Sequence, residues 1–144
     1  MIREFEYKDK PDIRRLFAVL TGEMLSESDL MNRLDFIKNS PVDSLYVYYL
    51  DGKVIGLLGF RIRENPEEYS RYGEISVIVV DSDYQKQGIG RSLMDFAERL
   101  SEKFNCKGTW LVSGFGRESP AHEFYKSLGY IPTGYRFVKS MAHD

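Results

Sequence analysis

Residues 73–100 constrain the fold of this chain more than any other stretch of its sequence. The first part, residues 73–80, is dominated by β-branched side chains, which are typical of a strand that is covered on much of both faces. Simple alternation along this strand places Glu74 on the same face as Ile78 and Val80. The stretch therefore predicts a buried strand with one acidic side chain on one of its faces.

A glycine-containing segment joins this strand to a predicted helix. Turn-forming residues at positions 81–83 end the strand, and from Ile89 onward the apolar residues recur at the spacing of one helical face. A helix N-terminus carries partial positive charge, and its first backbone amides have no partner within the helix. Because Gly88 and Gly90 lack side chains, the backbone can approach a bulky anion such as a pyrophosphate. The segment therefore predicts a phosphate-binding loop, with an ordinary strand-to-helix turn as the alternative.

The pattern of this loop distinguishes between kinds of phosphate ligand. A Walker loop needs GxxxxGK followed by Ser or Thr, which the chain lacks, and the dinucleotide fingerprint GxGxxG fails because Leu93 stands at its third glycine. What remains is Gln-x-x-Gly-x-Gly over residues 85–90, after a strand that ends in VIVVD. This arrangement resembles the pyrophosphate loop of the GNAT superfamily of N-acetyltransferases.

A second motif carries the same resemblance. Residues 121–130, AHEFYKSLGY, resemble the A-x-x-F-Y-x-x-x-G-(F/Y) segment of the family and follow the loop at a similar separation. The predicted order of elements, β-α-α-β-β-β-α-β-α-β, also matches the family from end to end. The resemblance therefore implies a single N-acetyltransferase domain over residues 1–144.

The individual elements follow from periodicity, caps and turns. Strands are predicted over residues 2–7, 44–50, 53–63, 73–80, 106–113, 130–131 and 135–139, and helices over residues 11–21, 27–39, 89–104 and 120–128. Asp9 and Ser26 are candidate helix caps, Asp51-Gly52 predicts a hairpin turn, and residues 64–71 predict a polar loop. The fold class is therefore α/β, with a mixed, mostly antiparallel sheet of six to seven strands flanked by four helices on both faces.

Composition excludes several classes of protein. The 144 residues are 42% hydrophobic, which fits one domain with its own core, and a net charge of -2 argues against a nucleic-acid surface. No apolar run approaches the roughly 20 residues of a membrane span. The single cysteine, Cys106, allows no intramolecular disulfide, and the charged N-terminus is unlike a signal peptide. We therefore expect a cytoplasmic protein that binds neither nucleic acid nor membrane.

Glu74 is the candidate general base. Acetyl transfer from a thioester to an amine needs a neutral amine, a polarised carbonyl and a protonated leaving thiolate. The resemblance implies this role for Glu74, because a glutamate at this offset before the glycine loop matches the base of the histone-acetyltransferase branch and of some small-molecule enzymes. The alternatives are a strand glutamate in a surface salt bridge, with a chain of water molecules serving as the base.

Tyr125 is the candidate general acid. In the family, the tyrosine of the second motif points at the thioester sulfur, which implies that Tyr125 protonates or stabilises the leaving thiolate. The pattern alone also fits packing, because Ala121, Phe124, Tyr125 and Leu128 form an apolar helical stripe.

The resemblance implies acetyl-CoA as the co-substrate and a set of contacts to it. Main-chain groups of Ile78, Val79 and Val80 would contact the pantetheine arm, and an amide there would polarise the carbonyl. The pyrophosphate would be held by the segment formed by Gln85, Lys86, Gln87, Gly88, Ile89, Gly90 and Arg91. Many relatives carry an asparagine before the second motif; here Ser119 is the candidate replacement, or only a helix cap. No metal is expected, because His122 and His143 lack the spacing of a ligand set.

The predicted reaction is acetylation of a primary amine of a small molecule or peptide by direct attack in a ternary complex. Residues 21–28 and 64–71 would line the acceptor groove, and their glutamates suit a cationic amine unless these are ordinary solvated loops. Two alternatives stay open: a non-catalytic acyl-CoA-binding or regulatory domain, and a nucleotide-phosphate-binding protein. A homodimer is common in the family, although no interface is specified by the sequence.

Overall fold

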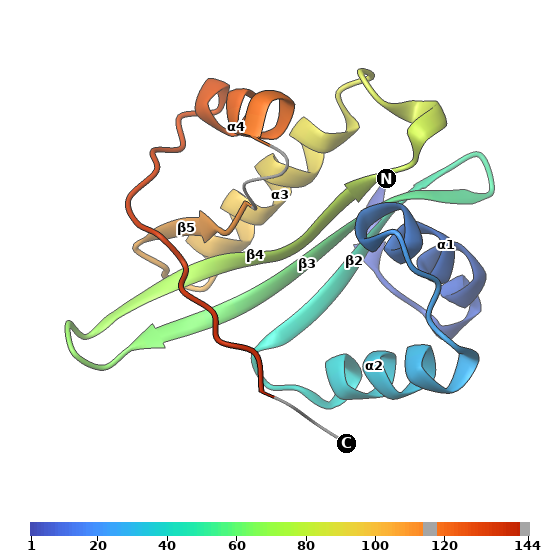
Figure 1. Ribbon diagram of the computed structural model, residues 1–144, viewed down its shortest axis with the longest axis horizontal. Coiled ribbons are helices and arrows are strands. Elements are labelled where there is room, and N and C mark those ends of the chain that lie inside the picture. The colour runs from blue at the N-terminus through green and yellow to red at the C-terminus, as the bar shows by residue number, and fades with distance from the viewer. Residues whose placement is uncertain (114–117, 142–144) are drawn as a thin grey trace. The chain divides into compact units, whose positions relative to one another are not determined.

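A computed structural model describes residues 1–113 and 118–141 (Figure 1). Its elements in chain order are β1 (Ile2–Glu4), a 3-10 turn η1 (Tyr7–Asp9), α1 (Lys10–Thr21), α2 (Glu27–Asn39), β2 (Asp43–Leu50), β3 (Lys53–Asn65), β4 (Ser70–Val80), η2 (Ser82–Tyr84), α3 (Ile89–Lys103), β5 (Gly108–Leu111) and α4 (Glu118–Ser127). The chain divides into two compact units, Met1–Trp110 and Leu111–Asp144. None of the helices described is long and apolar enough to cross a membrane.

The first unit is built on a sheet of five strands in the order β1-β2-β3-β4-β5. The pairings from β1 to β4 are antiparallel, whereas β5 follows the helical crossover α3 and runs in the same direction as β4 (Figure 1). The hairpin between β2 and β3 turns at Asp51 and Gly52, whose φ angles of 50° and 80° suit a two-residue turn with left-handed backbone. The predicted mixed, mostly antiparallel sheet is confirmed.

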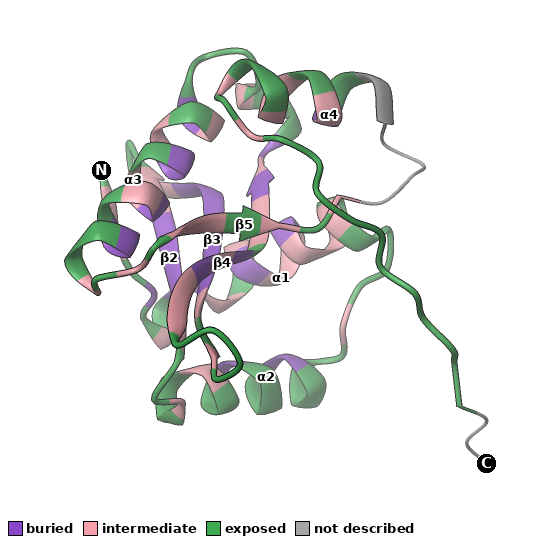
Figure 2. Cartoon of the chain, turned by 90° about the vertical axis from the view of Figure 1, so that its left-hand side faces the viewer, coloured by how far each residue is buried: buried purple, intermediate pink, exposed green. Residues whose placement is uncertain are grey.

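Helices cover both faces of this sheet, as predicted. On one face, Ile13 and Leu16 of α1 and Leu30 and Leu34 of α2 are fully buried in a core that includes Leu45, Val47, Leu57 and Val79 of the strands. On the other face α3 packs closely, because a Cβ added at Gly56 would lie 3.3 Å from Leu93. Figure 2 shows the buried residues of the helices on the sides that face the sheet. Burying each leucine contributes about 1.5–3 kcal/mol to the stability of these layers.

Two of the helix boundaries have the predicted chemistry, and one cap differs. Ser26 accepts a hydrogen bond from the Asp29 amide (3.1 Å), and Gly22, with φ of 84°, ends α1. Asp9 occupies the cap position of α1, but its side chain makes no capping bond. Its carboxylate instead accepts two hydrogen bonds from Arg3 (2.8 and 3.0 Å) and one from the Glu6 amide, which ties η1 to β1.

A β-bulge in β4 changes the face on which Glu74 lies. Gly59 pairs with Val77 and Phe60 pairs with Ile75, so Ser76 is an extra residue in β4. The alternation therefore reverses at Ser76, and Glu74 shares a face with Val77 and Val79. The sequence-based prediction that Glu74 faces the same way as Ile78 and Val80 is wrong, because simple alternation takes no account of a bulge.

The hairpin of β3 and β4 is longer than predicted. Pairing continues to Asn65 and Ser70, so half of the polar segment predicted as a loop, residues 64–71, is paired strand. Cross-strand contacts supply the reason: Glu64 lies opposite Arg71 and forms an ion pair with it. Only residues 66–69 remain as the turn.

The second unit contains α4, which Gly129 follows with a φ of 93°. Residues 130–141 contain neither helix nor strand, so the predicted strands at 130–131 and 135–139 are not found. The sheet accordingly has five strands in the described parts of the chain rather than six to seven. Alternating side chains can favour a strand, but a strand forms only where a neighbour accepts its backbone hydrogen bonds.

Candidate active site

Asp81 fixes the point where β4 ends and the predicted phosphate loop begins. Its amide donates to the Ile55 carbonyl (2.8 Å), and its buried carboxylate accepts from the Asp83 amide (3.0 Å) and from Arg15. Lys53 approaches the same carboxylate at 3.6 Å. Burial opposes ionisation of Asp81, but the Asp83 amide and the Arg15 guanidinium outweigh it and lower the pKa of the carboxyl. The loop therefore starts from a rigid anchor.

The loop itself is exposed from Gln85 to Gly88 and has an unusual backbone. Lys86 and Gly88 have φ angles of 64° and 81°, in the left-handed region that favours glycine. A Cβ added at Gly88 would meet no other atom within 4 Å, so the space beside it is open. Gly88 is the N-cap residue of α3 and supplies no side-chain cap.

Helix α3 holds the loop through its buried face. Ile89 and Leu93 are buried, whereas Gly90 is half-buried and Arg91 is exposed. The first intrahelical bond of this turn runs from the Ser92 amide to the Gly88 carbonyl (3.0 Å). The amides that precede Ser92 have no acceptor within the helix, which is the general condition for anion binding at a helix N-terminus.

The C-terminal half of β4 extends past its neighbour β5. The Lys107 amide donates to the Arg71 carbonyl (2.6 Å), so β5 begins beside the start of β4, and it is only four residues long. It therefore ends before it reaches Ile78, Val79 and Val80, which pair with β3 on their other side. Backbone groups on this edge of β4 are not used by β5, which suits the predicted main-chain contacts to a pantetheine arm.

Glu74 lies in a row of charged side chains across three strands. Asp43, Arg61 and Glu74 are directly opposite one another in β2, β3 and β4. Arg61 donates from Nε to Asp43 Oδ1 (2.7 Å) and lies 3.9 Å from Glu74 Oε1, while Arg63 Nε lies 3.6 Å from the same oxygen. The Glu74 side chain is only 15% exposed, and its Oε1 atom is buried without a hydrogen bond from any residue described.

This geometry bears on both interpretations of Glu74. The carboxylate does form ion pairs, as the structural alternative expected, but their distances exceed hydrogen-bond length. A buried carboxylate oxygen without a donor is costly, by about 1–3 kcal/mol, and such atoms often mark functional sites. Arg61, Arg63 and Trp110, whose ring lies 5.7 Å from Arg63, were missed as site candidates. Arg61 and Arg63 occupy alternate positions on β3, which gives a partial signal, but the strand register is needed to bring them and Trp110 of β5 together beside Glu74.

Trp110 lies on β5 and is 37% exposed, so it is not part of the core. Three of the five glutamates in the predicted acceptor groove form ion pairs. Glu27 pairs with Arg14 (3.7 Å), Glu68 pairs with Lys107 (3.7 Å), and Glu64 pairs with Arg71. These pairs reduce the excess negative charge on which a cationic acceptor was predicted.

Tyr125 and Ser119 belong to the second unit, whereas Glu74 and the loop belong to the first. Tyr125 is half-buried on α4, with its ring 5.5 Å from that of Phe124, and Ala121 of the same stripe is buried. The Tyr125 carbonyl accepts from the amides of Leu128 and Tyr130, both at 3.1 Å, and so helps to end the helix. Ser119 lies in the first turn of α4, and its side chain is outside the part described.

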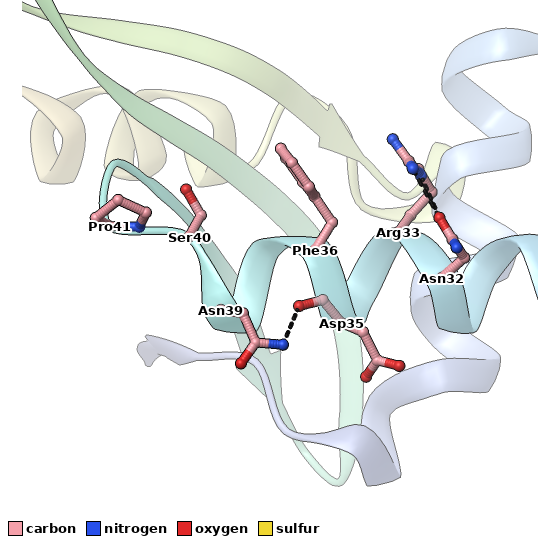
Figure 3. Close-up of a pocket in the computed structure, with 7 residues that line it drawn as sticks. All are labelled: Asn32, Arg33, Asp35, Phe36, Asn39, Ser40 and Pro41. Carbon is pink, nitrogen blue, oxygen red and sulfur yellow. Dashed lines mark hydrogen bonds between the residues drawn. The ribbon is translucent and has the colours of Figure 1, made fainter.

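The other candidate regions carry less chemistry. A surface hollow of about 530 Å³ runs along α2, and Figure 3 shows its lining residues: Asn32, Arg33, Asp35, Phe36, Asn39, Ser40 and Pro41. It contains none of the predicted site residues, and the polar contacts drawn there are local ones within α2. Over the residues described, no three His, Cys, Asp or Glu side chains form a metal-binding group, and His143 lies outside those residues.

The chain is similar to several known N-acetyltransferases and acetyltransferases. The chain is similar to the aminoalkylphosphonate N-acetyltransferase of Salmonella typhimurium, at 25% identity over 141 residues that cover 96% of this chain and 91% of that protein. It is 27% identical over 129 residues to the N-acetylaspartate synthetase of Xenopus tropicalis, covering 85% of this chain and 44% of that protein. A GNAT family acetyltransferase structure from Staphylococcus aureus has a TM-score of 0.83 and 28% identity, with 98% of each chain covered.

The family match extends over most of the chain and confirms the resemblance drawn from the glycine loop and the second motif. Residues 10–130 match the acetyltransferase (GNAT) family, a range that includes β2, β3 and β4, the loop before α3, and the Ala-His-Glu-Phe-Tyr segment of α4. The chain belongs to the GNAT family of acetyltransferases.

Proposed function

We propose that this chain transfers an acetyl group from acetyl-CoA to a primary amine of a small molecule or peptide, by direct attack within a ternary complex. The observation that carries the proposal is the exposed glycine loop at the start of α3, which follows β4, the strand that carries Glu74. Glu74 Oε1 is buried and receives no hydrogen bond from the residues described. The family supplies the acetyl-CoA donor. The Salmonella relative, named as an N-acetyltransferase of aminoalkylphosphonates, supports a small-molecule acceptor.

The residues of the loop fit the pyrophosphate of coenzyme A. The left-handed backbone at Gly88 and the open space beside it allow close approach of an anion. Backbone amides from Gln85 to Arg91 would hold the pyrophosphate, with Lys86 and Arg91 adding positive charge. Main-chain groups of residues 78–80 would hold the pantetheine arm along the free part of the β4 edge, so that the thioester carbonyl meets a backbone donor.

Glu74 has the role of proton acceptor in this proposal. An alkylammonium with a pKa of roughly 10 is mostly protonated near neutral pH and cannot attack a carbonyl. Glu74 would take that proton directly or through water. The amine nitrogen then forms a bond to the acetyl carbon while the carbon–sulfur bond breaks, and the sulfur leaves as a thiolate. Tyr125 would donate a proton to that thiolate, a role that rests on the second motif.

Steady-state release of free thiol from acetyl-CoA with a panel of amines tests these roles. We expect Glu74→Gln to lower kcat by about 100-fold, and Tyr125→Phe by about 10- to 100-fold, with little change in coenzyme A affinity. Glu102→Gln and Tyr135→Phe are matched controls, because both side chains are exposed and lie outside the segments predicted to bind coenzyme A or the acceptor. Calorimetry with coenzyme A, ATP and NAD measures the affinity of each variant.

Each outcome separates one part of the proposal from the rest. Turnover that is unchanged in both variants would keep the enzyme and contradict the roles of Glu74 and Tyr125. Tight coenzyme A binding with no thiol release on any amine would favour the non-catalytic acyl-CoA-binding domain instead. Binding of ATP or NAD in preference to coenzyme A would contradict the assignment of the loop.

A further inference from the structure

The polar cluster around Glu74 has a defined position on the sheet. Asp43, Arg61 and Glu74 continue the rows of strand side chains that α1 and α2 cover farther along the same face. Arg63 lies one alternate position beyond Arg61, opposite Tyr72. The Arg61 and Arg63 side chains are 35% and 47% exposed, so solvent and small molecules reach this end of the face.

The two arginines of this cluster are held in different ways. Arg61 donates a short hydrogen bond to Asp43 (2.7 Å), and Asp43 is itself bonded by the Ser40 hydroxyl (3.1 Å), so Arg61 is part of the framework. Arg63 rests over the Trp110 ring at 5.7 Å and approaches Glu74 at 3.6 Å. No hydrogen bond from its guanidinium to another described residue is found. Arg63 is therefore positioned by weak contacts while its N–H donors stay available.

Charge balance limits what can bind beside Glu74. The cluster holds two carboxylates, Asp43 and Glu74, and two guanidinium groups, Arg61 and Arg63, which cancel. A purely cationic amine at Glu74 would leave Arg63 facing another positive charge, which is unfavourable. A molecule with both an ammonium and an anionic group replaces the long Glu74–Arg63 contact with two complementary contacts and leaves the net charge unchanged.

We infer that the acceptor is a small amine that carries a negatively charged oxyanion, and that Arg63 binds this oxyanion beside the amine held by Glu74. The planar guanidinium can donate two parallel hydrogen bonds to a phosphonate, phosphate or carboxylate. The Trp110 ring, 5.7 Å away, would help to hold the guanidinium in place. This inference rests on the proposed function and narrows its acceptor from primary amines in general to zwitterionic ones.

The test compares amines that differ only in the group at the far end: aminoethylphosphonate, β-alanine, ethanolamine and diaminopropane. Thiol-release kinetics are measured for wild type, Arg63→Gln and Arg99→Gln. Arg99 is the matched control, because it is an exposed arginine on α3 whose guanidinium lies 5.9 Å from the Phe96 ring, outside the segments predicted to bind coenzyme A or the acceptor. The phosphonate and the carboxylate amines distinguish which oxyanion is preferred.

We expect wild type to prefer the two anionic amines. Arg63→Gln should raise KM for them by about 10- to 100-fold, with kcat within about threefold and with ethanolamine kinetics unchanged. Arg63→Lys should recover part of the affinity, because it keeps the charge without the planar fork. Arg99→Gln should leave every KM within about twofold. Thermal unfolding of each variant establishes that it is folded.

Two results would overturn the inference while leaving acetyl transfer intact: a wild-type preference for diaminopropane or ethanolamine, or an equal rise in KM for all amines in Arg63→Gln. Absence of thiol release with any amine contradicts the proposed function. In that case, calorimetric titration of aminoethylphosphonate and ethanolamine into the coenzyme A-bound protein still decides the inference, since it requires tighter binding of the anionic amine and loss of that difference in Arg63→Gln.

Discussion

Asp81 connects three parts of the first unit. Its carboxylate accepts hydrogen bonds from the Arg15 guanidinium of α1 and the Asp83 amide of η2, and it forms an ion pair with the Lys53 ammonium of β3. The Asp81 backbone amide donates to the Ile55 carbonyl. Arg15 also donates to the Val54 carbonyl (3.0 Å). A single side chain therefore couples the position of the phosphate loop to the packing of α1 on the sheet.

Asp81 gives the stability of the protein a definite dependence on pH. Although burial opposes ionisation, its hydrogen bonds lower the pKa of the Asp81 carboxyl in the folded state. Its contribution is therefore present above the unfolded-state pKa of about 3.9 and is lost as pH falls through the lower, folded-state value. We expect Asp81→Asn to reduce the free energy of unfolding at pH 7 by about 1–3 kcal/mol and to flatten its decline at acid pH.

Urea unfolding of wild type, Asp81→Asn and Asp95→Asn from neutral to acid pH measures this effect. Asp95 is an exposed aspartate on α3 and serves as the control. The account of Asp81 is contradicted if Asp81→Asn and Asp95→Asn have the same pH dependence as wild type. Asp9, whose pKa is also lowered, because its bonds to Arg3 and to the Glu6 amide outweigh its burial, remains intact in both variants and contributes equally.

At the scale of elements, the turn from β4 into α3 depends on one glycine with left-handed backbone, beside which a side chain would meet no other atom. Gly88 has φ of 81° with open space where a side chain would be. Gly22 at the end of α1 has nearly the same backbone, φ of 84°, and equally open surroundings. A substitution at either glycine should therefore reduce the free energy of unfolding by a similar amount. Only Gly88 has a proposed role in binding coenzyme A.

We expect Gly88→Ala and Gly22→Ala to destabilise the protein equally, by about 1–2 kcal/mol, because each forces an L-residue into a left-handed backbone. Only Gly88→Ala should weaken coenzyme A, by about tenfold, because a methyl group would displace the pyrophosphate from the first-turn amides. Urea unfolding and calorimetric titration with coenzyme A measure the two effects. Equal coenzyme A affinity in the two variants would contradict the placement of the pyrophosphate at Gly88.

The bulge at Ser76 is the element-scale feature that the sequence did not reveal. Gly59 permits it, because a Cβ there would lie 2.6 Å from the Ser76 hydroxyl and 2.9 Å from the Val77 Cβ. A bulge depends on contacts between two strands, which no periodicity within one strand contains. The same reasoning explains why the end of the β3–β4 hairpin, residues 64–71, was predicted as a loop: the ion pair between Glu64 and Arg71 forms only once the strands are in register.

At the scale of the whole molecule, local signals predicted the elements and hydrophobic patterning predicted their layers. The caps at Ser26 and Gly22 and the apolar stripe of α3 are each encoded within a few residues. The strands predicted at residues 130–131 and 135–139 are not found, because these residues alternate but have no strand partner in the structure described. An alternating segment forms a strand only when a neighbouring strand accepts its backbone hydrogen bonds, and the fold decides which segments are neighbours.

One part of the candidate site was predictable from the sequence and another part was not. The glycine loop is one continuous segment, so the sequence alone showed its resemblance to the GNAT family, and the family match covers it. The cluster of Arg61, Arg63 and Trp110 beside Glu74 comes from three strands that only the sheet register brings together. The roles of Glu74 and Tyr125 remain predictions for kinetics to test.

The most direct test of the whole account follows both products of one reaction. The protein is incubated with acetyl-CoA and aminoethylphosphonate, free thiol is titrated over time, and the amine is analysed by mass spectrometry. We expect one N-acetylated amine for each thiol released, with no thiol release when the amine is omitted. Thiol release without N-acetylation, or no release with any amine while coenzyme A is bound, would contradict the assignment of this chain as an acetyl-CoA-dependent N-acetyltransferase.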